Sequence, residues 1–250
     1  MTSPDLKGRL ALVTGASGGI GRATCLALAD LGCSIAAHYF SNEEKARSLV
    51  QEIEKRGVKA EAFKADLGDY DEVRALHTSV TRALGAPAIL FNNAGTTLSK
   101  SNLPSISDLS VSDFERTWRT NCGSAFLLTQ LCLPDMETSA WGRVIFCSSV
   151  AAFTGGIVGP HYASSKSALH GLIHWLAGAY AKKGVTVNGV APALIEGTAM
   201  LPGATAELEG KVPVGRLGRP EEVAETVVWM VRTGYVTNKV VAVDGGMFVQ

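Results

Sequence analysis

The segment Thr14-Gly15-Ala16-Ser17-Gly18-Gly19-Ile20-Gly21 decides the fold that we expect for this chain. It follows a short apolar run, Arg9–Thr14, and leads into a predicted helix, Gly19–Leu31, which ends at Gly32, a residue type favoured at helix C-termini. A short apolar run that ends in a glycine-rich turn is typical of a buried strand in a parallel sheet. The chain therefore begins with a predicted strand, turn and helix.

The same alternation of strands and helices continues to the end of the chain. A second strand is predicted at Ser34–Tyr39, and a second helix begins at Ser41–Glu44 and ends at Gly57. The other predicted strands are Lys59–Ala65, Ala88–Asn92, Arg143–Ser148, Val185–Val190 and Val240–Val243. The other predicted helices are Asp69–Leu84, Ser112–Glu137, His161–Lys182 and Pro220–Arg232. Helices between successive strands require right-handed crossovers and parallel strands. We therefore expect one α/β domain over residues 1–250, a Rossmann-type doubly wound parallel sheet flanked by helices.

Composition excludes several classes of partner. The chain has 250 residues, 46% of them apolar, and its 23 basic residues balance 23 acidic ones. This balance argues against nucleic acid or an anionic membrane as a partner. No secretory leader and no apolar run of about 20 residues is visible, so we expect a cytoplasmic protein. The five scattered cysteines are predicted to be reduced and buried, and no metal-ligand cluster is visible.

A glycine turn between a strand and a helix suits the pyrophosphate of a dinucleotide. The pyrophosphate needs backbone amides at a helix N-terminus and no side chains in its way, and Gly15, Gly19 and Gly21 meet that need. The alternative is a tight turn that only packs the helix on the strand. The predicted cofactor contacts in the turn are Gly15, Ser17, Gly18, Gly19, Ile20 and Gly21.

The end of the second strand indicates which dinucleotide is bound. An acidic residue there would hold the ribose 2′-hydroxyl and repel a 2′-phosphate, but the segment His38–Asn42 contains none. Ser41 and Asn42 could bond a phosphate, with Arg22 or His38 adding positive charge, or they could only cap the second helix. NADP(H) is therefore the preferred cofactor, with NAD(H) possible. The predicted contacts in this segment are Tyr39, Ser41 and Asn42.

Tyr162 and Lys166 lie four residues apart, on one face of a predicted helix. A free tyrosine has a pKa near 10, and a nearby ammonium with a positive nicotinamide ring would lower that pKa toward neutrality. Ser149 follows a strand, where its hydroxyl could bond a carbonyl oxygen. The alternatives are a solvated Tyr–Lys pair and an Asn121 that only bonds backbone within its helix.

These segments together resemble the short-chain dehydrogenase/reductase family along nearly the whole chain. Order and spacing both fit, including the thirteen positions from Ser149 to Tyr162. The matching motifs are the glycine turn, Asp66 in Ala-Asp-Leu, Asn92-Asn93-Ala94-Gly95, Asn121, Ser149, Tyr162 with Lys166, and Pro192.

The resemblance implies a catalytic role for four residues. Tyr162 would be the general acid in reduction and the general base in oxidation, while Ser149 polarises the carbonyl. Lys166 would bind the nicotinamide ribose and tune Tyr162. Asn121 would hold a water that links Lys166 to solvent.

The resemblance also implies where the cofactor lies. Asp66 would contact the adenine amino group, Asn92, Ala94 and Gly95 the adenosine side, and Ile195 and Thr198 the carboxamide. The implied contacts outside the two segments above are Asp66, Leu67, Asn93, Ala94, Gly95, Tyr162, Lys166, Pro192, Ile195 and Thr198.

The chain departs from the family pattern at a few positions. Gly18 and Phe40 stand where NADP-preferring relatives often carry basic residues, and Ala193 replaces the glycine that usually follows Pro192. Residues 194–215 are expected to form a mobile lid over the substrate. Its apolar lining would include Met200, Leu201 and Phe153, and His161 would either face the pocket or start its helix.

Within the family, the pattern most resembles the 3-oxoacyl-[acyl-carrier-protein] reductases. The expected reaction is NADP(H)-dependent reduction of a ketone or 3-oxoacyl carbonyl, in a homotetramer. Lys182 and Lys183 fall where such enzymes dock acyl carrier protein, but Ala140 replaces an arginine common at another docking position. A general reductase of free small ketones is therefore an alternative. The missing carboxylate disfavours an NAD-dependent polyol or sugar dehydrogenase, and the intact catalytic set disfavours a non-catalytic NADP-sensing regulator.

Overall fold

The computed structural model describes residues 5–201 and 205–248. Its sheet has seven parallel strands in the order β3-β2-β1-β4-β5-β6-β7. The chain builds outward from β1 to β3 and then returns to place β4 beside β1, so the strand order reverses there. The strands are β1 (Leu10–Val13), β2 (Ser34–Tyr39), β3 (Ala60–Lys64), β4 (Ile89–Asn92), β5 (Gly142–Cys147), β6 (Val185–Pro192) and β7 (Val240–Val243).

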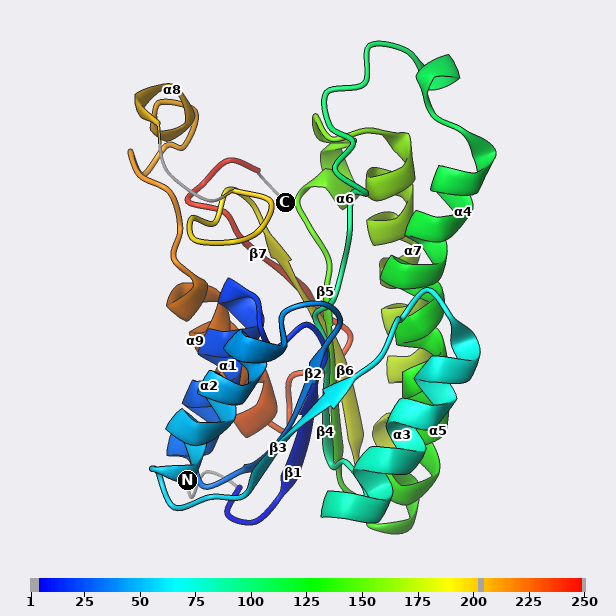
Figure 1. Ribbon diagram of the computed structural model, residues 1–250, viewed down its shortest axis with the longest axis vertical. Coiled ribbons are helices and arrows are strands. Elements are labelled where there is room, and N and C mark those ends of the chain that lie inside the picture. Colours follow the sequence, from blue (N-terminus) through cyan, green and yellow to red (C-terminus); the bar gives the residue numbers. More distant parts are fainter. Residues whose placement is uncertain (1–4, 202–204, 249–250) are drawn as a thin grey trace.

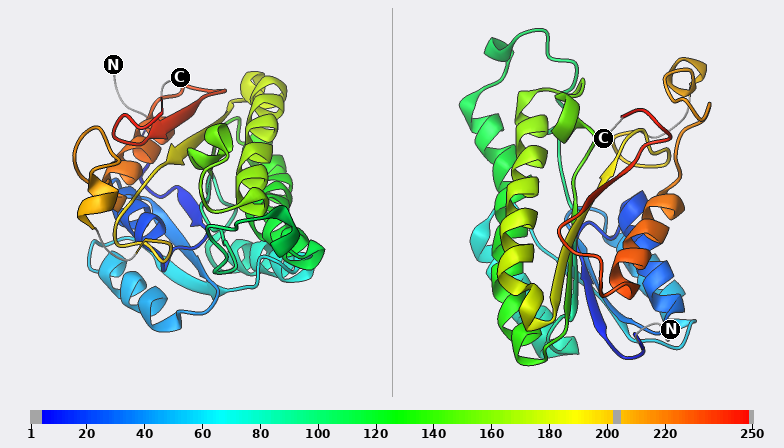
Figure 2. Two further views of the ribbon diagram at one scale, coloured as in Figure 1. Left: turned by 90° about the horizontal axis from the view of Figure 1, so that it is seen from above. Right: turned by 180° about the vertical axis from the view of Figure 1, so that it is seen from behind.

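Helices cover both faces of the sheet, as Figures 1 and 2 show. One face carries α1 (Gly19–Asp30), α2 (Glu43–Glu54) and α9 (Pro220–Arg232). The other carries α3 (Tyr70–Leu84), α4 (Val111–Trp118), α5 (Ser124–Thr138) and α7 (Pro160–Tyr180). Short elements complete the chain: η1 (Ile106–Asp108), η2 (Arg119–Gly123), α6 (Ala151–Thr154), η3 (Ala181–Lys183) and α8 (Ala206–Glu209).

Two hydrophobic cores lie on opposite faces of the sheet. Leu12 and Leu90 point into the core beneath α3, α5 and α7, whereas Val13 and Phe91 point into the core beneath α1 and α9. Successive residues of a strand face opposite sides, so strands covered on both faces are apolar throughout. The predicted α/β class, with a doubly wound parallel sheet, is confirmed. The predicted burial of the five cysteines is confirmed as well, and all five are free thiols.

The segment predicted as one helix over Ser112–Glu137 is helical throughout, from Val111 to Thr138, but it contains a π-helical turn that the sequence did not indicate. The segment is two α-helices joined by the π-helical turn η2, in which the N–H of Ser124 bonds the carbonyl of Arg119. Tyr70 lies against Gly123 so closely that a side chain there would overlap its hydroxyl. Wide turns of this kind often mark functional sites, and this one contains Asn121. The helices α6 and α8 were not predicted, because four residues are too few to show a helical period.

Candidate active site

The predicted site residues gather at the carboxyl ends of β1, β4, β5 and β6. The glycine turn follows β1, the Asn92–Gly95 segment ends β4, Ser149 follows β5, and Pro192 ends β6. This edge, at the top of the sheet in Figure 1, includes the reversal of strand order between β1 and β4. Ligands of open α/β sheets bind at such a place.

The glycines of the turn are required by close contacts. Gly15 has a φ of +64°, which favours glycine, and a side chain on Gly21 would overlap the carbonyl oxygen of Gly15. A side chain on Gly19 would come within 2.8 Å of the carbonyl oxygen of Gly197. The N-cap of α1 is Gly18, which has no side chain that could bond the first amides of the helix. The turn thus packs the helix tightly and also leaves the backbone amides at its start open to an anion.

The hypothesis that His38 offers positive charge to a phosphate is wrong. Its side chain is buried, its Nδ1 accepts a hydrogen bond from the N–H of Gly15 at 3.0 Å, and its Nε2 lies 3.0 Å from the carbonyl oxygen of Ala65. Burial lowers the pKa of His38 to about 4, despite the opposing effects of the Ala65 hydrogen bond and the Asp66 charge. The ring is therefore neutral at physiological pH.

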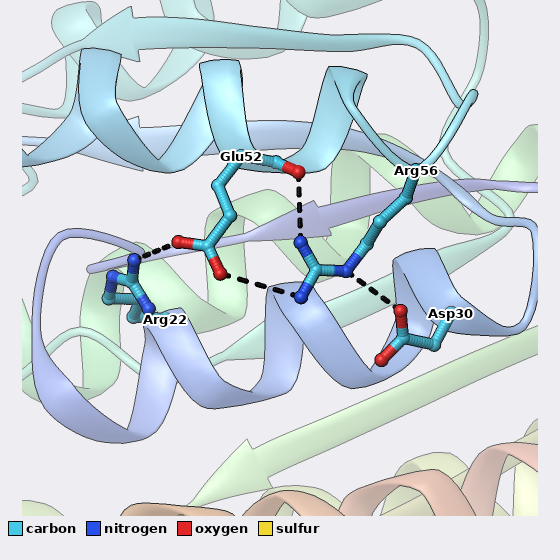
Figure 3. A network of polar contacts seen from close by, with 4 residues as sticks. All are labelled: Arg22, Asp30, Glu52 and Arg56. Carbon is cyan, nitrogen blue, oxygen red and sulfur yellow. Dashed lines mark hydrogen bonds and ion pairs between the residues drawn. The ribbon is translucent and has the colours of Figure 1, made fainter.

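The positive charge of Arg22 is also engaged. Its guanidinium pairs with Glu52, whose carboxylate contacts Arg56, and Arg56 in turn bonds Asp30 at 2.7 Å (Figure 3). This network ties α1 to α2. Asn42 caps α2, because its side chain accepts a hydrogen bond from the N–H of Lys45.

Asp66 is held by Arg116 of α4, which bonds both carboxylate oxygens, at 2.7 and 2.6 Å. The N–H of Gly68 donates to the same carboxylate at 2.8 Å, and a side chain on Gly68 would overlap the guanidinium of Arg116. Burial alone would raise the pKa of Asp66, but the bonds from Arg116 and Gly68 outweigh it and lower that pKa below its usual value. The carboxylate is thus ionised and fixed in orientation.

The two asparagines after β4 hold the edge of the sheet together. The Asn93 amide donates to the carbonyl oxygens of Thr14 and Gly15, and the Thr14 hydroxyl accepts from the N–H groups of Asn93 and Ala94 at 2.9 Å each. Asn92 is buried and donates to Thr129 of α5, so its side chain serves packing. The glycine turn and the segment after β4 therefore form one bonded unit.

The structure brings the candidate catalytic residues together. Lys166 donates to the carbonyl oxygen of Cys147 at 2.6 Å and lies 5.7 Å from the ring centre of Tyr162. A Cβ on Gly95 would sit 3.1 Å from the Lys166 nitrogen, so that ammonium faces the strand end. Ser149 is partly exposed, its hydroxyl accepts from the N–H of Ala151 at 3.2 Å, and it lies near enough to Tyr162 to lower the pKa of that residue. Its neighbour Ser148 is buried against His170 at 2.8 Å, which supports the choice of Ser149.

Burial dominates the titration of the Tyr–Lys pair. Desolvation raises the pKa of Tyr162, the Cys147 thiol adds to that effect, and the hydrogen bond from Ser149 opposes it. Desolvation also lowers the pKa of Lys166. In the free protein the pKa of Tyr162 is thus above its ordinary value because its own burial outweighs the effect of Ser149, whereas the lowering expected from the sequence included a bound, positively charged nicotinamide ring.

The Asn121 side chain makes three hydrogen bonds, which use both N–H groups of its amide and one lone pair of its Oδ1. Its Oδ1 accepts from the N–H of Thr96 at 2.7 Å, and its Nδ2 donates to the Thr96 carbonyl and to the Ser165 hydroxyl, both at 3.0 Å. Ser165 in turn donates to the carbonyl of Tyr162 at 2.8 Å. The side chain thus links the loop after β4 to the catalytic helix, and its Oδ1 borders the space beside Gly95 that the Lys166 nitrogen also faces.

A family model described as short chain dehydrogenase matches residues 9–209. The chain belongs to the short-chain dehydrogenase/reductase family. It is 36% identical to the 3-oxoacyl-[acyl-carrier-protein] reductase of Aquifex aeolicus, over 97% of this chain and 98% of that protein. It is 35% identical to nodulation protein G of Azospirillum brasilense, over 96% and 98%. It is 34% identical to the L-rhamnose 1-dehydrogenase (NADP(+)) of Thermoplasma acidophilum, over 98% of both chains.

As a short-chain dehydrogenase/reductase, the chain is an NAD(P)-dependent oxidoreductase that acts on CH–OH groups. The described residues contain no group of three or more His, Cys, Asp or Glu placed to hold a metal. In the same part of the chain, no helix combines the length and the apolar character that a membrane span needs.

The loop after β6 is held by bonds within itself. Ile195 pairs with Gly218, and the Thr198 hydroxyl donates to the Ile195 carbonyl at 3.1 Å and accepts from the N–H of Leu201 at 3.2 Å. Met200 is 49% exposed, and residues 202–204 of the expected lid lie outside the described residues.

Two side chains expected near the substrate have other partners. Phe153 stacks on Phe248 at 4.7 Å and against His170. His161 is fully buried in the first turn of α7, where its Nε2 lies 3.2 Å from the carbonyl oxygen of Thr97, so the placement at the helix start is the one that the structure shows.

Several residues of the site were missed by sequence reasoning. Arg116, Thr96 and Ser165 touch predicted site residues only after folding, at separations of 50, 25 and 44 residues. The direction of the His38 ring was missed for the same reason. A sequence pattern carries no signal for such contacts.

We expect Gly21→Ala to lower both the melting temperature and the affinity for NADPH. The added methyl group would overlap the Gly15 carbonyl, and overpacking of this kind costs about 1–3 kcal/mol. Differential scanning fluorimetry and titration calorimetry measure the two effects. The matched control is Gly178→Ala in α7, where nothing lies within 4 Å and the substitution should be neutral or slightly stabilising. Equal behaviour of the two variants would contradict the prediction.

We expect Arg116→Ala to weaken NADPH binding several-fold while leaving turnover at saturating NADPH nearly unchanged. Loss of the guanidinium frees the Asp66 carboxylate to rotate and lets its pKa rise toward the usual value. The measurement is the NADPH dissociation constant. Arg74→Ala, which removes an exposed arginine paired with Asp71 at 3.0 Å, is the control and should leave that constant unchanged.

Proposed function

We propose that this chain reduces the 3-oxo group of an acyl thioester or related ketone by hydride transfer from NADPH. The observation that carries the proposal is the buried Tyr162 at the carboxyl edge of the sheet, with the buried Lys166 nitrogen 5.7 Å from its ring centre and Ser149 near it. Support for the substrate class comes from relatives at 34–36% identity that are named 3-oxoacyl-[acyl-carrier-protein] reductases.

The residues present fit a nicotinamide dinucleotide. A side chain on Gly95 would fill the space in front of the Lys166 ammonium, and a glycine leaves that space open. The bound cofactor would supply the hydride. Lys166 would bind the nicotinamide ribose, Asp66 the adenine, and the loop of Pro192, Ile195 and Thr198 the carboxamide.

The proposed acid is Tyr162. Its hydroxyl would donate a proton to the substrate oxygen as hydride reaches the carbonyl carbon, and Ser149 would donate a hydrogen bond to the same oxygen. A raised pKa keeps Tyr162 protonated at neutral pH, as the reductive direction requires. The oxidative direction needs the phenolate and is penalised by the same burial.

NADPH is proposed over NADH because residues His38–Asn42, at the end of β2, include no carboxylate to repel a 2′-phosphate. Phe40 and Ser41 are exposed there. With His38 neutral, Arg22 paired and Asn42 engaged as a cap, the hydroxyl of Ser41 is the predicted phosphate contact that remains. The preference should therefore be moderate.

Small free ketones are a second candidate substrate class, favoured by the surface around Lys183. That ammonium pairs with Glu137 at 2.8 Å and covers the ring of Tyr180, so its charge is compensated. The pair lies at the far end of α7, whose 21 residues span about 30 Å from the Tyr162 end. An acidic carrier protein docked there would have to serve another subunit's site.

A homotetramer remains part of the proposal. Phe126 of α5 and Trp175 of α7 are 50% and 68% exposed on one layer of helices, which suits burial against a second copy. A monomeric mass in light scattering would refute this. The expected cytoplasmic location stays a prediction.

We expect Tyr162→Phe to lower kcat by about 10²–10⁴-fold, the usual contribution of a general acid, with the NADPH dissociation constant unchanged. Stopped-flow oxidation of NADPH with ethyl acetoacetate and fluorescence titration measure the two quantities. A variant that binds NADPH and keeps its turnover would contradict the assignment. NADPH binding without turnover by the wild type, on any ketone, would favour an NADP-sensing regulator.

We expect the rate of reduction to change little from about pH 6 to about pH 9, because the acid stays protonated below its raised pKa. The reverse oxidation should accelerate with rising pH over the same range. Initial rates in both directions, with 3-oxoacyl thioesters, ethyl acetoacetate and L-rhamnose compared, test the pH profile and the substrate together. A preference for L-rhamnose or for NADH would contradict the proposed function and favour the alternative that this chain is a polyol or sugar dehydrogenase.

A further inference from the structure

The imidazole of His38 lies between two loops that flank the cofactor-binding edge. One ring nitrogen contacts Gly15, the first residue of the glycine turn, and the other contacts Ala65, the residue before Asp66. The main-chain carbonyl of His38 also accepts from the N–H of Ala16 at 2.8 Å. One residue of β2 therefore bonds the turn after β1 twice and the loop after β3 once.

The two partners determine the tautomer of the ring. The N–H of Gly15 can only donate, so Nδ1 must be an unprotonated acceptor. The carbonyl of Ala65 can only accept, so the proton is on Nε2. A second proton on Nδ1 would point at the N–H of Gly15 and break that bond, so only the neutral ring makes both contacts.

The surroundings of His38 favour that neutral form. Its side chain is 2% exposed, and across the sheet it pairs with Phe63 of β3. The glycine turn packed against it contributes backbone atoms, and Asp66 is the charged group that acts on it. Arg116 already binds the Asp66 carboxylate, which reduces the attraction of that charge for a proton on the ring.

We propose that His38 is a positioning residue for the cofactor. Its neutral ring bonds both the glycine turn and the residue before Asp66, and these two bonds set the distance between the two loops. In the proposed cofactor complex the glycine turn would face the pyrophosphate, and the Asp66 loop would face the adenine. His38 itself does not touch the cofactor. The inference rests on cofactor binding by the family and not on the proposed ketone substrate.

The test compares three variants. His38→Leu removes both bonds, His38→Asn keeps an acceptor for Gly15 but is too short to reach Ala65, and Ile35→Ala makes a cavity elsewhere in β2 at a fully buried side chain. The NADPH dissociation constant is measured by titration calorimetry, and kcat is measured at saturating NADPH. Calorimetry needs no substrate, so a wrong substrate assignment does not affect the result.

We expect His38→Leu to raise the NADPH dissociation constant roughly ten-fold or more, as loss of one or two hydrogen bonds would, with kcat changed less than about two-fold. His38→Asn should raise the dissociation constant by a smaller factor, and Ile35→Ala should destabilise the fold without changing it. An unchanged constant in His38→Leu, or an equal rise in Ile35→Ala, would overturn the proposal. If His38→Leu does not fold, an unchanged constant in His38→Asn overturns it.

The pH dependence of stability gives an independent readout. The pKa of His38 is about 4 in the folded protein and 6.5 in the unfolded reference, so its contribution is fully present above pH 6.5. That contribution is lost as the pH falls from 6.5 toward 4. The melting temperature of the wild type should therefore fall more steeply over this range than that of His38→Asn. Parallel curves would show that the ring is not held neutral, and would overturn the proposal.

Discussion

The close packing of α1 on β1 is the constraint on which the rest of the structure depends. Gly21 has no room for a side chain because the Gly15 carbonyl fills that space. The tight turn brings the start of α1 to the sheet edge, where β1 and β4 lie side by side. Asn93 and Thr14 then bond the two strand ends. A bulkier turn would separate the helix start from the segment that faces Lys166.

The site is built by burying groups that water would otherwise stabilise. Lys166 loses its hydration and gains the Cys147 carbonyl, while Tyr162 loses hydration and gains Ser149. Both pKa values shift toward the neutral forms of the side chains. Asp66 shows the opposite outcome, because hydrogen bonds from one nitrogen of Arg116 and from the N–H of Gly68 more than offset its burial. The balance between desolvation and hydrogen bonding thus differs at the two ends of one site.

Features encoded by neighbouring residues were predictable from the sequence. The strand, turn and helix around Gly15, the four-residue spacing of Tyr162 and Lys166, and the alternation of elements all lie within short windows. The unpredicted features depend on partners far apart in the chain. The tautomer of His38 needs Gly15 and Ala65, and the orientation of Asp66 needs Arg116. The π-helical turn η2 lies against Tyr70, a contact that no periodicity could indicate.

The segment after β6 differs in character from the sheet beneath it. The helix α8 buries none of its residues, and Met200 and Val214 are 49% and 60% exposed, whereas β1 and β4 are buried throughout. Local opening costs least where few apolar contacts are lost, so α8 can open at lower cost than the strands, whose amides stay protected from hydrogen exchange. Access to the site and global stability are therefore set by different residues. Sequence change in this segment can alter what enters the site without weakening the fold that holds the cofactor.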